Sequence, residues 1–376
     1  METTDLTSPG YWESDSIDLR LNPRREIDAE GLDPFLRDDV GIQSSVVLAT
    51  SGSSGGFKFV VLSKLALLNS AEAVIEHSGL GRDDMSLAGL SDFHVGGLGI
   101  YARAFLSGSK IVEMDSAGWE RDGSDLVRVL EEKAVTLTSM TPTHLHDLVS
   151  HKAQCPEALR LVFLGGGRMD AALIEKAREL GWPIRVSYGM TEAGSQIATA
   201  RDDSVDLLPV LPHWETKVDI DGRLAIRGEA LFSGYAIREG AQWKFEDARD
   251  GGGWFMTGDR CELQDGTLRF LGRADDLVKV SGELVSLSEI NRLAESVARE
   301  MGSDAAAIAL PDDRRENELV VVMKACERDA SDLLRDLNSQ LDGIEAIRRV
   351  VFVDQLPRTE IGKLDRVRLE QMATEG

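Results

Sequence analysis

The chain has 376 residues, enough for two domains, and its content of 42% hydrophobic and 28% charged residues is that of an ordinary globular protein. Its 42 Lys and Arg against 65 Asp and Glu give a net charge of −23, which argues against general binding to nucleic acid or to an anionic membrane surface. No apolar run approaches transmembrane length, the polar N-terminus is unlike a signal peptide, and three widely spaced cysteines make no disulfide framework. We therefore expect a cytoplasmic protein.

Residues 1–43 show little periodicity and are expected to be irregular. From residue 44 to about 189, short apolar runs alternate with helical patterns, and this alternation predicts a mostly parallel sheet covered by helices. The expected strands are 45–49, 59–62, 86–90, 110–114, 135–139, 160–164 and 184–188. The expected helices are 64–78, 124–133, 143–150 and 170–180.

Beyond Pro209 the pattern changes to β-branched and aromatic residues interrupted by Asp-Gly pairs, which predicts a small antiparallel β unit. The last hundred residues indicate a compact α+β module. Its expected elements are helices 288–300 and 331–341 and strands 305–310, 319–324 and 349–353. The fold class is thus α/β, with a large domain over residues 1–272 and a smaller C-terminal domain over 275–376.

A run of glycines and hydroxyls follows the first expected strand and ends in one lysine. Its small residues let backbone N–H and O–H donors gather around a polyanion, and the lysine adds a positive charge. The Walker pattern requires Gly-Lys followed by Ser or Thr, whereas this lysine lies between two phenylalanines. Taken alone, the composition would equally suit a flexible linker. The run is Thr50, Ser51, Gly52, Ser53, Ser54, Gly55, Gly56, Phe57 and Lys58.

Four further motifs follow this loop in a fixed order. They are Ser187-Tyr188-Gly189-Met190-Thr191-Glu192, Thr257-Gly258-Asp259, the segment from Gly272 to Gly282, and Pro357-Arg358-Thr359-Glu360-Ile361-Gly362-Lys363. Together the five motifs resemble those of the AMP-forming acyl-CoA synthetases and adenylation domains. Within that superfamily the chain is most similar to the 2-succinylbenzoate–CoA ligases of menaquinone biosynthesis, through 93–98, 141–145, 164–167 and 187–199.

The chain also departs from the family pattern. Phe57 stands where relatives usually have proline before the loop lysine, and the loop begins at residue 50, earlier than in most relatives. The resemblance therefore implies a trimmed large domain, and a homodimer is one way to cover its flank. No nucleic-acid or membrane partner is expected.

The resemblance implies two half-reactions that use ATP, Mg²⁺ and coenzyme A. A carboxylate first attacks the α-phosphate of ATP and expels pyrophosphate, and the thiol of coenzyme A then displaces AMP from the acyl-adenylate. The protein mainly positions these groups and stabilises charge. The expected substrate is 2-succinylbenzoate.

The same resemblance gives roles to the nucleotide-site residues. The loop from Thr50 to Lys58 binds the β- and γ-phosphates, Thr191 binds phosphate and Glu192 holds Mg²⁺. Asp259 accepts from the ribose hydroxyls, and Arg273 adds a ribose or phosphate contact. The adenine slot is expected from Gly165, Gly166, Gly167 and Tyr188, although the glycines also suit a tight turn. Ser187 and Gly189, on either side of Tyr188, are also expected to bind the nucleotide.

Four residues of the C-terminal domain complete the implied site. Lys363 bridges the substrate carboxylate and the α-phosphate during adenylation. Asp275 is the hinge between the half-reactions, after which the segment from Lys279 to Gly282 faces the acyl carbon.

The acid pocket is assigned to His94, Gly97, Ser195, Gln196 and Thr199, with Ser195, Gln196 and Arg103 as candidates for the second, aromatic carboxylate. Three histidines at 144, 146 and 151 share a helical stretch, but their spacing does not indicate a metal site.

Three alternatives remain. The first is an AMP-forming ligase for another small aryl or acyl acid. The second is a nucleotide-dependent phosphotransferase, which would yield ADP. The third is an inactive nucleotide-binding relative.

Overall fold

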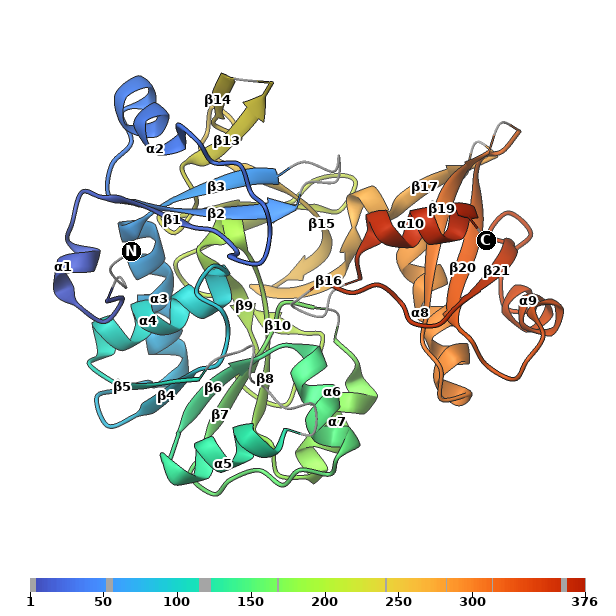
Figure 1. Ribbon diagram of the computed structural model, residues 1–376, viewed down its shortest axis with the longest axis horizontal. Helices are drawn as coiled ribbons and strands as arrows, with labels where there is room; N and C mark the ends of the chain where they lie inside the picture. The colour runs from blue at the N-terminus through green and yellow to red at the C-terminus, as the bar shows by residue number, and fades with distance from the viewer. Residues whose placement is uncertain are drawn as a thin grey trace. The chain divides into compact units, whose positions relative to one another are not determined.

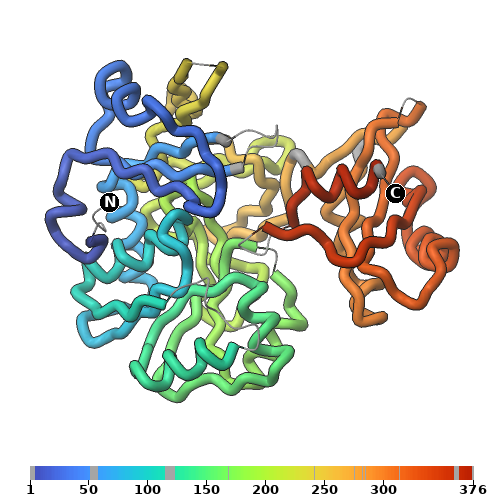
Figure 2. The backbone as a smooth tube through the Cα atoms, viewed as in Figure 1, coloured from blue at the N-terminus to red at the C-terminus, as the bar shows by residue number. Residues whose placement is uncertain are grey.

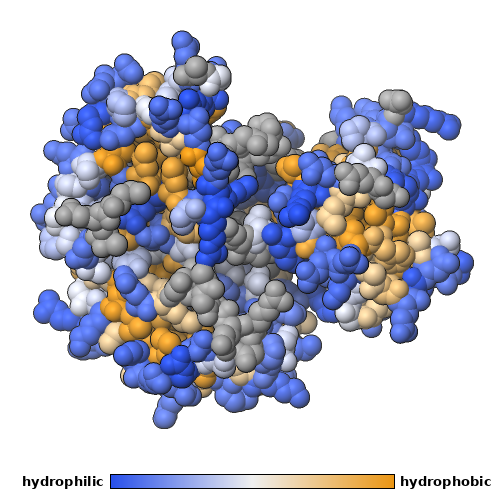
Figure 3. All heavy atoms as spheres, in the orientation of Figure 1, coloured by the Kyte–Doolittle hydropathy of each residue, from blue (hydrophilic) through white to orange (hydrophobic). Residues whose placement is uncertain are grey.

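The structure is a computed structural model that describes residues 5–51, 57–114, 123–167, 169–240, 242–281, 283–312, 314–359 and 364–375. The chain forms two compact units, Met1–Thr257 with Cys261–Phe270 and Gly258–Arg260 with Leu271–Gly376. The backbone of the second unit is drawn in orange and red in Figure 2. Many hydrophilic side chains surround smaller apolar patches on the face seen in Figure 3. None of the described helices is long and apolar enough to cross a membrane.

A six-stranded sheet in the first unit has the order β5-β4-β6-β7-β8-β9 (Figure 1). Its strands from β5 to β8 are parallel, and β9 is antiparallel to β8. This confirms the α/β class expected from the alternating pattern. The bounds are β4 Met85–Ala88, β5 Lys110–Glu113, β6 Leu137–Met140, β7 Leu161–Leu164, β8 Ile184–Met190 and β9 Ser195–Thr199.

Four of the helices in this unit match the prediction closely: α3 Lys64–Ser78, α5 Ser124–Glu132, α6 Pro142–Ser150 and α7 Ala171–Glu179. A fifth helix, α4 Val95–Ser107, was not predicted, because its first turns contain three glycines, which favour helix poorly. One of them is required for close packing, since a Cβ at Gly97 would lie 2.2 Å from the Ser91 carbonyl oxygen. The helix forms where it packs against α3.

A separate five-stranded sheet has the order β1-β2-β3-β13-β14. The sequence pattern placed 45–49 and 59–62 in the mostly parallel sheet, and this was wrong, because β2 and β3 pair antiparallel here. The short connection between them leaves no room for the crossover that parallel strands need. The bounds are β1 Ile17–Arg20, β2 Ser45–Ser51, β3 Phe57–Ser63, β13 Gly234–Glu239 and β14 Gln242–Glu246.

The expected antiparallel β unit is present as a sheet in the order β10-β16-β15-β12-β11. Both Asp-Gly pairs lie at hairpin turns, and Asp265 and Gly266 have φ of 49° and 74°, as a type I′ turn requires. The bounds are β10 Leu208–Pro209, β11 Glu215–Val218, β12 Arg223–Arg227, β15 Phe255–Gln264 and β16 Thr267–Arg273.

The N-terminal segment is more regular than expected, with α1 Pro9–Trp12, β1, α2 Leu32–Pro34 and the π-helix η1 Phe35–Val40. Buried Lys64 holds it in place. Its Nζ donates to the Tyr11 carbonyl oxygen at 2.9 Å and to Ser14 Oγ at 2.7 Å. These partners are about 50 residues away in the chain, so the local pattern could not show them.

The second unit contains the expected α+β elements, and the unpredicted α10 covers part of them. Its strands β17 and β18 form a hairpin, and β19-β20-β21 form a sheet. Alternate residues of β19 face two different cores, one containing α8 and the other α10. The bounds are η3 Ala274–Asp276, β17 Leu277–Val280, β18 Glu283–Ser286, α8 Leu287–Glu300, β19 Ala305–Asp312, β20 Glu316–Lys324, α9 Ala330–Asn338, β21 Ile347–Val353 and α10 Arg366–Glu375.

Candidate active site

The carboxyl ends of β7 and β8 carry two of the predicted nucleotide motifs. Gly165 to Gly167 directly follow β7, and the 3-10 turn η2 Thr191–Ala193 directly follows β8. Because these strands are parallel neighbours, both motifs lie at the same edge of the sheet, where open α/β sheets bind ligands. The backbone needs glycine there, since a Cβ at Gly165 would lie 2.7 Å from Ser187 Oγ, and Gly166 has φ of 76°.

A tyrosine that the sequence analysis did not single out joins Glu192 to the phosphate loop. The Tyr235 hydroxyl donates to Glu192 Oε1 at 2.8 Å. Lys58 Nζ lies 5.1 Å from the centroid of the Tyr235 ring, within cation–π range. Tyr235 comes from β13, which pairs directly with β3, the strand that carries Lys58. Two predicted site residues from different sheets therefore meet at one aromatic side chain.

The predicted phosphate loop connects β2 to β3. Thr50 is paired with Lys58 across this hairpin, and its Oγ1 donates to the Lys58 carbonyl oxygen at 3.2 Å. The side chain of Ser51 is not described, and Gly52, Ser53, Ser54, Gly55 and Gly56 lie outside the described residues. The two ends of the loop are thus fixed by strand pairing.

An aromatic pair lies beside the predicted adenine slot. The rings of Tyr188 and Phe270 have centroids 5.6 Å apart at an interplanar angle of 31°. Tyr188 is half-buried and Phe270 is 43% exposed. Phe270 was not predicted as a site residue, although its aromatic character within a strand was an available signal. Gly189 is required locally, because a Cβ there would lie 1.8 Å from the Ser195 carbonyl oxygen.

Buried Arg103 forms a polar centre in the predicted acid pocket. Its Nη2 donates to Ser139 Oγ at 3.4 Å, and its guanidinium lies 5.5 Å from the centroid of Phe163. A Cβ built at Gly99 would lie 3.3 Å from Arg103 Nη1 and 3.7 Å from Ser195 Oγ. The guanidinium of Arg103 and the hydroxyl of Ser195 therefore both lie close to Gly99. Burial lowers the pKa of Arg103 to about 10. Within the described part of the chain, no Asp or Glu forms an ion pair with Arg103.

The other predicted acid-pocket residues are placed differently. Gln196 and Thr199 are buried, and Thr199 Oγ1 donates to Gln196 Oε1 at 2.6 Å, so these groups satisfy each other. His94 is half-buried at the N-terminal end of α4, and Gly97 lies in the first turn of that helix. Thus Ser195 and Arg103 are brought together, and Gln196 and Thr199 form a separate buried pair.

The histidines near β6 have structural environments. His144 shares a capping box with Thr141 at the start of α6, and burial lowers its pKa to about 4. His146 and His151 are exposed. Among the described residues, no group of three or more His, Cys, Asp or Glu gathers to hold a metal.

The remaining predicted residues belong to the second unit. Asp259, which is buried within β15, lies 3.4 Å from Arg273 Nη1, so the two expected ribose ligands are together. Lys279 is exposed on β17, and Asp275 lies in η3, although its side chain is not described. Gly282 and Lys363 lie outside the described residues. Buried Asp276, not predicted, accepts from Ser288 Oγ at 2.8 Å and pairs with Arg366.

An α/β fold with a glycine-rich turn and a carboxylate at one edge of its parallel sheet, and with a loop lysine that meets the carboxylate at Tyr235, is typical of a nucleotide-binding enzyme. The chain belongs to the AMP-binding enzyme family, whose profile matches residues 40–236, just over half of the chain. It is 29% identical to the 2-succinylbenzoate–CoA ligase of Bacillus pumilus in an alignment of length 347 that covers 87% of this chain and 69% of that protein. The ligase of Staphylococcus aureus is 28% identical over 97% of this chain and 75% of its own length.

Solved structures of similar proteins agree with this assignment. The o-succinylbenzoate CoA synthetase (MenE) from Bacillus subtilis, in complex with the acyl-adenylate intermediate OSB-AMP, is 26% identical with a TM-score of 0.74. The similarity covers 86% of this chain and 68% of that one. The same enzyme with ATP and magnesium ion has a TM-score of 0.73 at 26% identity, with 86% and 69% covered.

Proposed function

We propose that this chain is an AMP-forming ligase that activates 2-succinylbenzoate with ATP and transfers the acyl group to coenzyme A, a step of menaquinone biosynthesis. The choice of 2-succinylbenzoate as the substrate is inferred from buried Arg103. This side chain lies beside Ser195 and Ser139 with no acidic partner among the described residues. A buried cation requires an anion, and the aromatic carboxylate of succinylbenzoate would supply it. The names of the similar ligases support the same choice.

The first half-reaction joins the succinyl carboxylate to AMP. A carboxylate oxygen attacks the α-phosphorus, the bond to pyrophosphate breaks, and pyrophosphate leaves with its negative charge. Lys58 and Thr191 are proposed to hold the phosphates, and Lys363 to neutralise the charge that develops between carboxylate and α-phosphate. The side chains of Asp259 and Arg273 are proposed to bind the ribose.

The second half-reaction forms the thioester. The thiol of coenzyme A loses its proton and attacks the acyl carbon, and the bond from that carbon to the AMP oxygen breaks. We propose that Asp275 is the hinge used between the two steps, and that Lys279 and Gly282 then serve thioester formation. ATP and coenzyme A are both available in the cytoplasm, the compartment in which we propose that the chain acts.

Magnesium fits the residues at the carboxyl end of β8. Glu192 is half-buried and is oriented by the Tyr235 hydroxyl at 2.8 Å, and Thr191 adds a hydroxyl oxygen beside it. Mg²⁺ prefers such hard oxygen ligands and is usually held by one or two carboxylates, water and substrate phosphates. When bound, the ion would neutralise phosphate charge as pyrophosphate leaves. Glu192 and Thr191, together with water and the substrate phosphates, would therefore be enough to hold the ion without further protein ligands.

The test compares two acids that differ in one group. Pyrophosphate release is measured with 2-succinylbenzoate and with 4-oxo-4-phenylbutanoate, which keeps the succinyl chain and lacks the aromatic carboxylate. The wild-type protein should prefer succinylbenzoate at least 100-fold in kcat/KM. The Arg103→Gln variant should lose most of that preference and keep its rate with the monocarboxylate, which a general folding defect would not do.

The products separate the alternatives. AMP formation without preference for the second carboxylate would favour a ligase for another acid. Release of ADP would indicate a phosphotransferase. If mass spectrometry detects neither acyl-adenylate nor thioester with any acid, the chain is an inactive relative and the proposal fails.

A further inference from the structure

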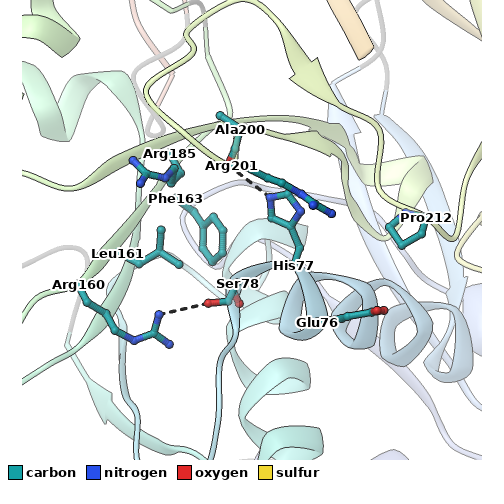
Figure 4. A pocket seen from close by; sticks show the side chains of 10 residues that line it. All are labelled: Glu76, His77, Ser78, Arg160, Leu161, Phe163, Arg185, Ala200, Arg201 and Pro212. Atoms are coloured by element: carbon teal, nitrogen blue, oxygen red, sulfur yellow. Dashed lines mark hydrogen bonds between the residues drawn. The ribbon is translucent and has the colours of Figure 1, made fainter. Parts of the chain in front are cut away.

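A cavity of about 430 Å³ lies near the amino ends of β7 and β8, whereas the nucleotide motifs follow the carboxyl ends of these strands. Figure 4 shows the side chains that line it. Its lining includes Arg160 at the start of β7, Arg185 near the start of β8, Arg201 just after β9, and His77 near the end of α3. Phe163 and Leu161 of β7 are both almost fully buried and form its apolar wall. We name this site the arginine cavity.

Three arginines and one glutamate line the arginine cavity, although the chain has a net charge of −23. Within the described ranges, no carboxylate or carbonyl group pairs with the Arg201 guanidinium. Arg185 Nη1 lies 3.1 Å from Asp203 Oδ1, but the same oxygen also lies 3.7 Å from Arg178 Nε, so one carboxylate serves two guanidinium groups. An added anion would be favoured there.

Two nearby acids do not cancel this charge at the cavity wall. Asp84 is used by Arg160, with contacts of 2.9 and 2.7 Å to its Nε and Nη2. Glu76 also lines the cavity, but its carboxylate lies away from Arg160 and Arg185 in Figure 4. Arg160 also donates to the Ser78 and Gly79 carbonyl oxygens at 3.2 and 3.3 Å, so its donors are used within the protein. The cavity thus offers an anion the guanidinium of Arg201 and the partly shared guanidinium of Arg185, beside the nearly buried apolar side chains of Phe163 and Leu161.

We propose that the arginine cavity binds a small aromatic carboxylate, whose anionic group pairs with Arg201 and Arg185 and whose ring packs against Phe163 and Leu161. Guanidinium groups bind carboxylates through paired N–H donors, and aromatic rings favour contact with an aromatic wall. Phe163 and Arg185 are direct neighbours in the β7–β8 pairing, so their side chains share one face of the sheet.

Phe163 lines the arginine cavity and also lies next to Arg103 of the candidate acid pocket. The Phe163 ring lies 5.5 Å from the Arg103 guanidinium. A ligand that packs against this ring should therefore alter the position of Arg103 and raise or lower the KM for the acid. This coupling, unlike the binding itself, rests on the proposed function.

Binding is tested by calorimetry on the full chain with 2-naphthoate, using 2-naphthamide as the neutral analogue. The Arg201→Gln variant should bind 2-naphthoate at least tenfold more weakly than wild type, and the amide should bind wild type equally weakly. Arg201 is exposed, so the substitution should leave the melting temperature unchanged. Arg128→Gln, at an exposed arginine of α5, is the matched control and should bind like wild type.

The Arg103→Gln variant distinguishes this cavity from the acid pocket. It should still bind 2-naphthoate if the arginine cavity is the site, with only the modest change in affinity that the contact between Arg103 and Phe163 would cause. Binding that is lost in Arg103→Gln and kept in Arg201→Gln would place the ligand in the acid pocket and overturn the proposal, as would no binding at millimolar concentration. An unchanged KM at saturating 2-naphthoate would overturn the coupling alone.

Discussion

Replacing Tyr235 with Phe removes one hydroxyl from the candidate active site and keeps the aromatic ring. The lost group donates to Glu192 Oε1 at 2.8 Å. A hydrogen bond to a charged group contributes about 1.5–3 kcal/mol, and about 1.4 kcal/mol corresponds to a factor of ten. The variant should therefore lower kcat/KM for pyrophosphate release by roughly 10- to 100-fold. Because the ring near Lys58 remains, the KM for ATP should change much less.

The assay measures pyrophosphate release while Mg²⁺ is titrated at saturating ATP and acid. If Tyr235 orients Glu192 as a magnesium ligand, the variant should need a higher Mg²⁺ concentration for half-maximal rate. Tyr101→Phe is the matched control, since its hydroxyl, on α4, donates to Glu113 Oε1 of β5 at 3.2 Å. Equal rates for wild type and Tyr235→Phe, or an equal loss in both variants, would refute the reasoning.

Three further predictions concern Lys363, Asp275 and Asp84. Lys363→Ala should reduce pyrophosphate release by orders of magnitude while thioester formation from preformed adenylate continues, and equal loss in both steps would contradict its role. Asp275→Pro should leave pyrophosphate release largely intact and strongly reduce thioester formation in the same two assays. If both half-reactions proceed normally in this variant, the hinge lies elsewhere. Hydrogen bonds from Arg160 hold the pKa of Asp84 at about 2, below its unfolded value near 3.8. Its stabilising effect should therefore be complete above about pH 4 and disappear as the pH falls through about 2. Asp84→Asn should lower the melting temperature at pH 7 and remove that acid-dependent loss.

The sequence predicted those elements that are stabilised by residues adjacent to them in the chain, such as helix caps and turn residues. The helix at 64–78 was predicted with its observed bounds, since Ser63 caps it and Gly79 adopts φ of 63° directly after it. The two Asp-Gly turns were found for the same reason, because their chemistry depends on adjacent residues. By contrast, α4 has a glycine-rich start and depends on packing against α3.

The placement of candidate site residues was predictable where a motif is contiguous, and it was not predictable where distant residues come together. Gly165 to Gly167 and Glu192 were expected from contiguous motifs that resemble those of the family, and the structure places them directly after β7 and β8. Tyr235 was missed because it is 43 residues from Glu192, and only the pairing of β13 with β3 brings it to Lys58. An alternating strand pattern shows that a tyrosine is present, but it does not show which carboxylate its hydroxyl will reach.

Arg103 also shows how burial can narrow a substrate class that motifs leave open. Removing a guanidinium from water costs several kcal/mol unless an anion compensates it, and the lowered pKa of Arg103 reflects that cost. The chain has 65 acidic residues, yet none in its described part pairs with this side chain. A monocarboxylic acid would use its only anion at the α-phosphate and leave Arg103 uncompensated. An acid with two carboxylates would satisfy both positions, which is why the buried cation favours succinylbenzoate over simple aryl or acyl acids.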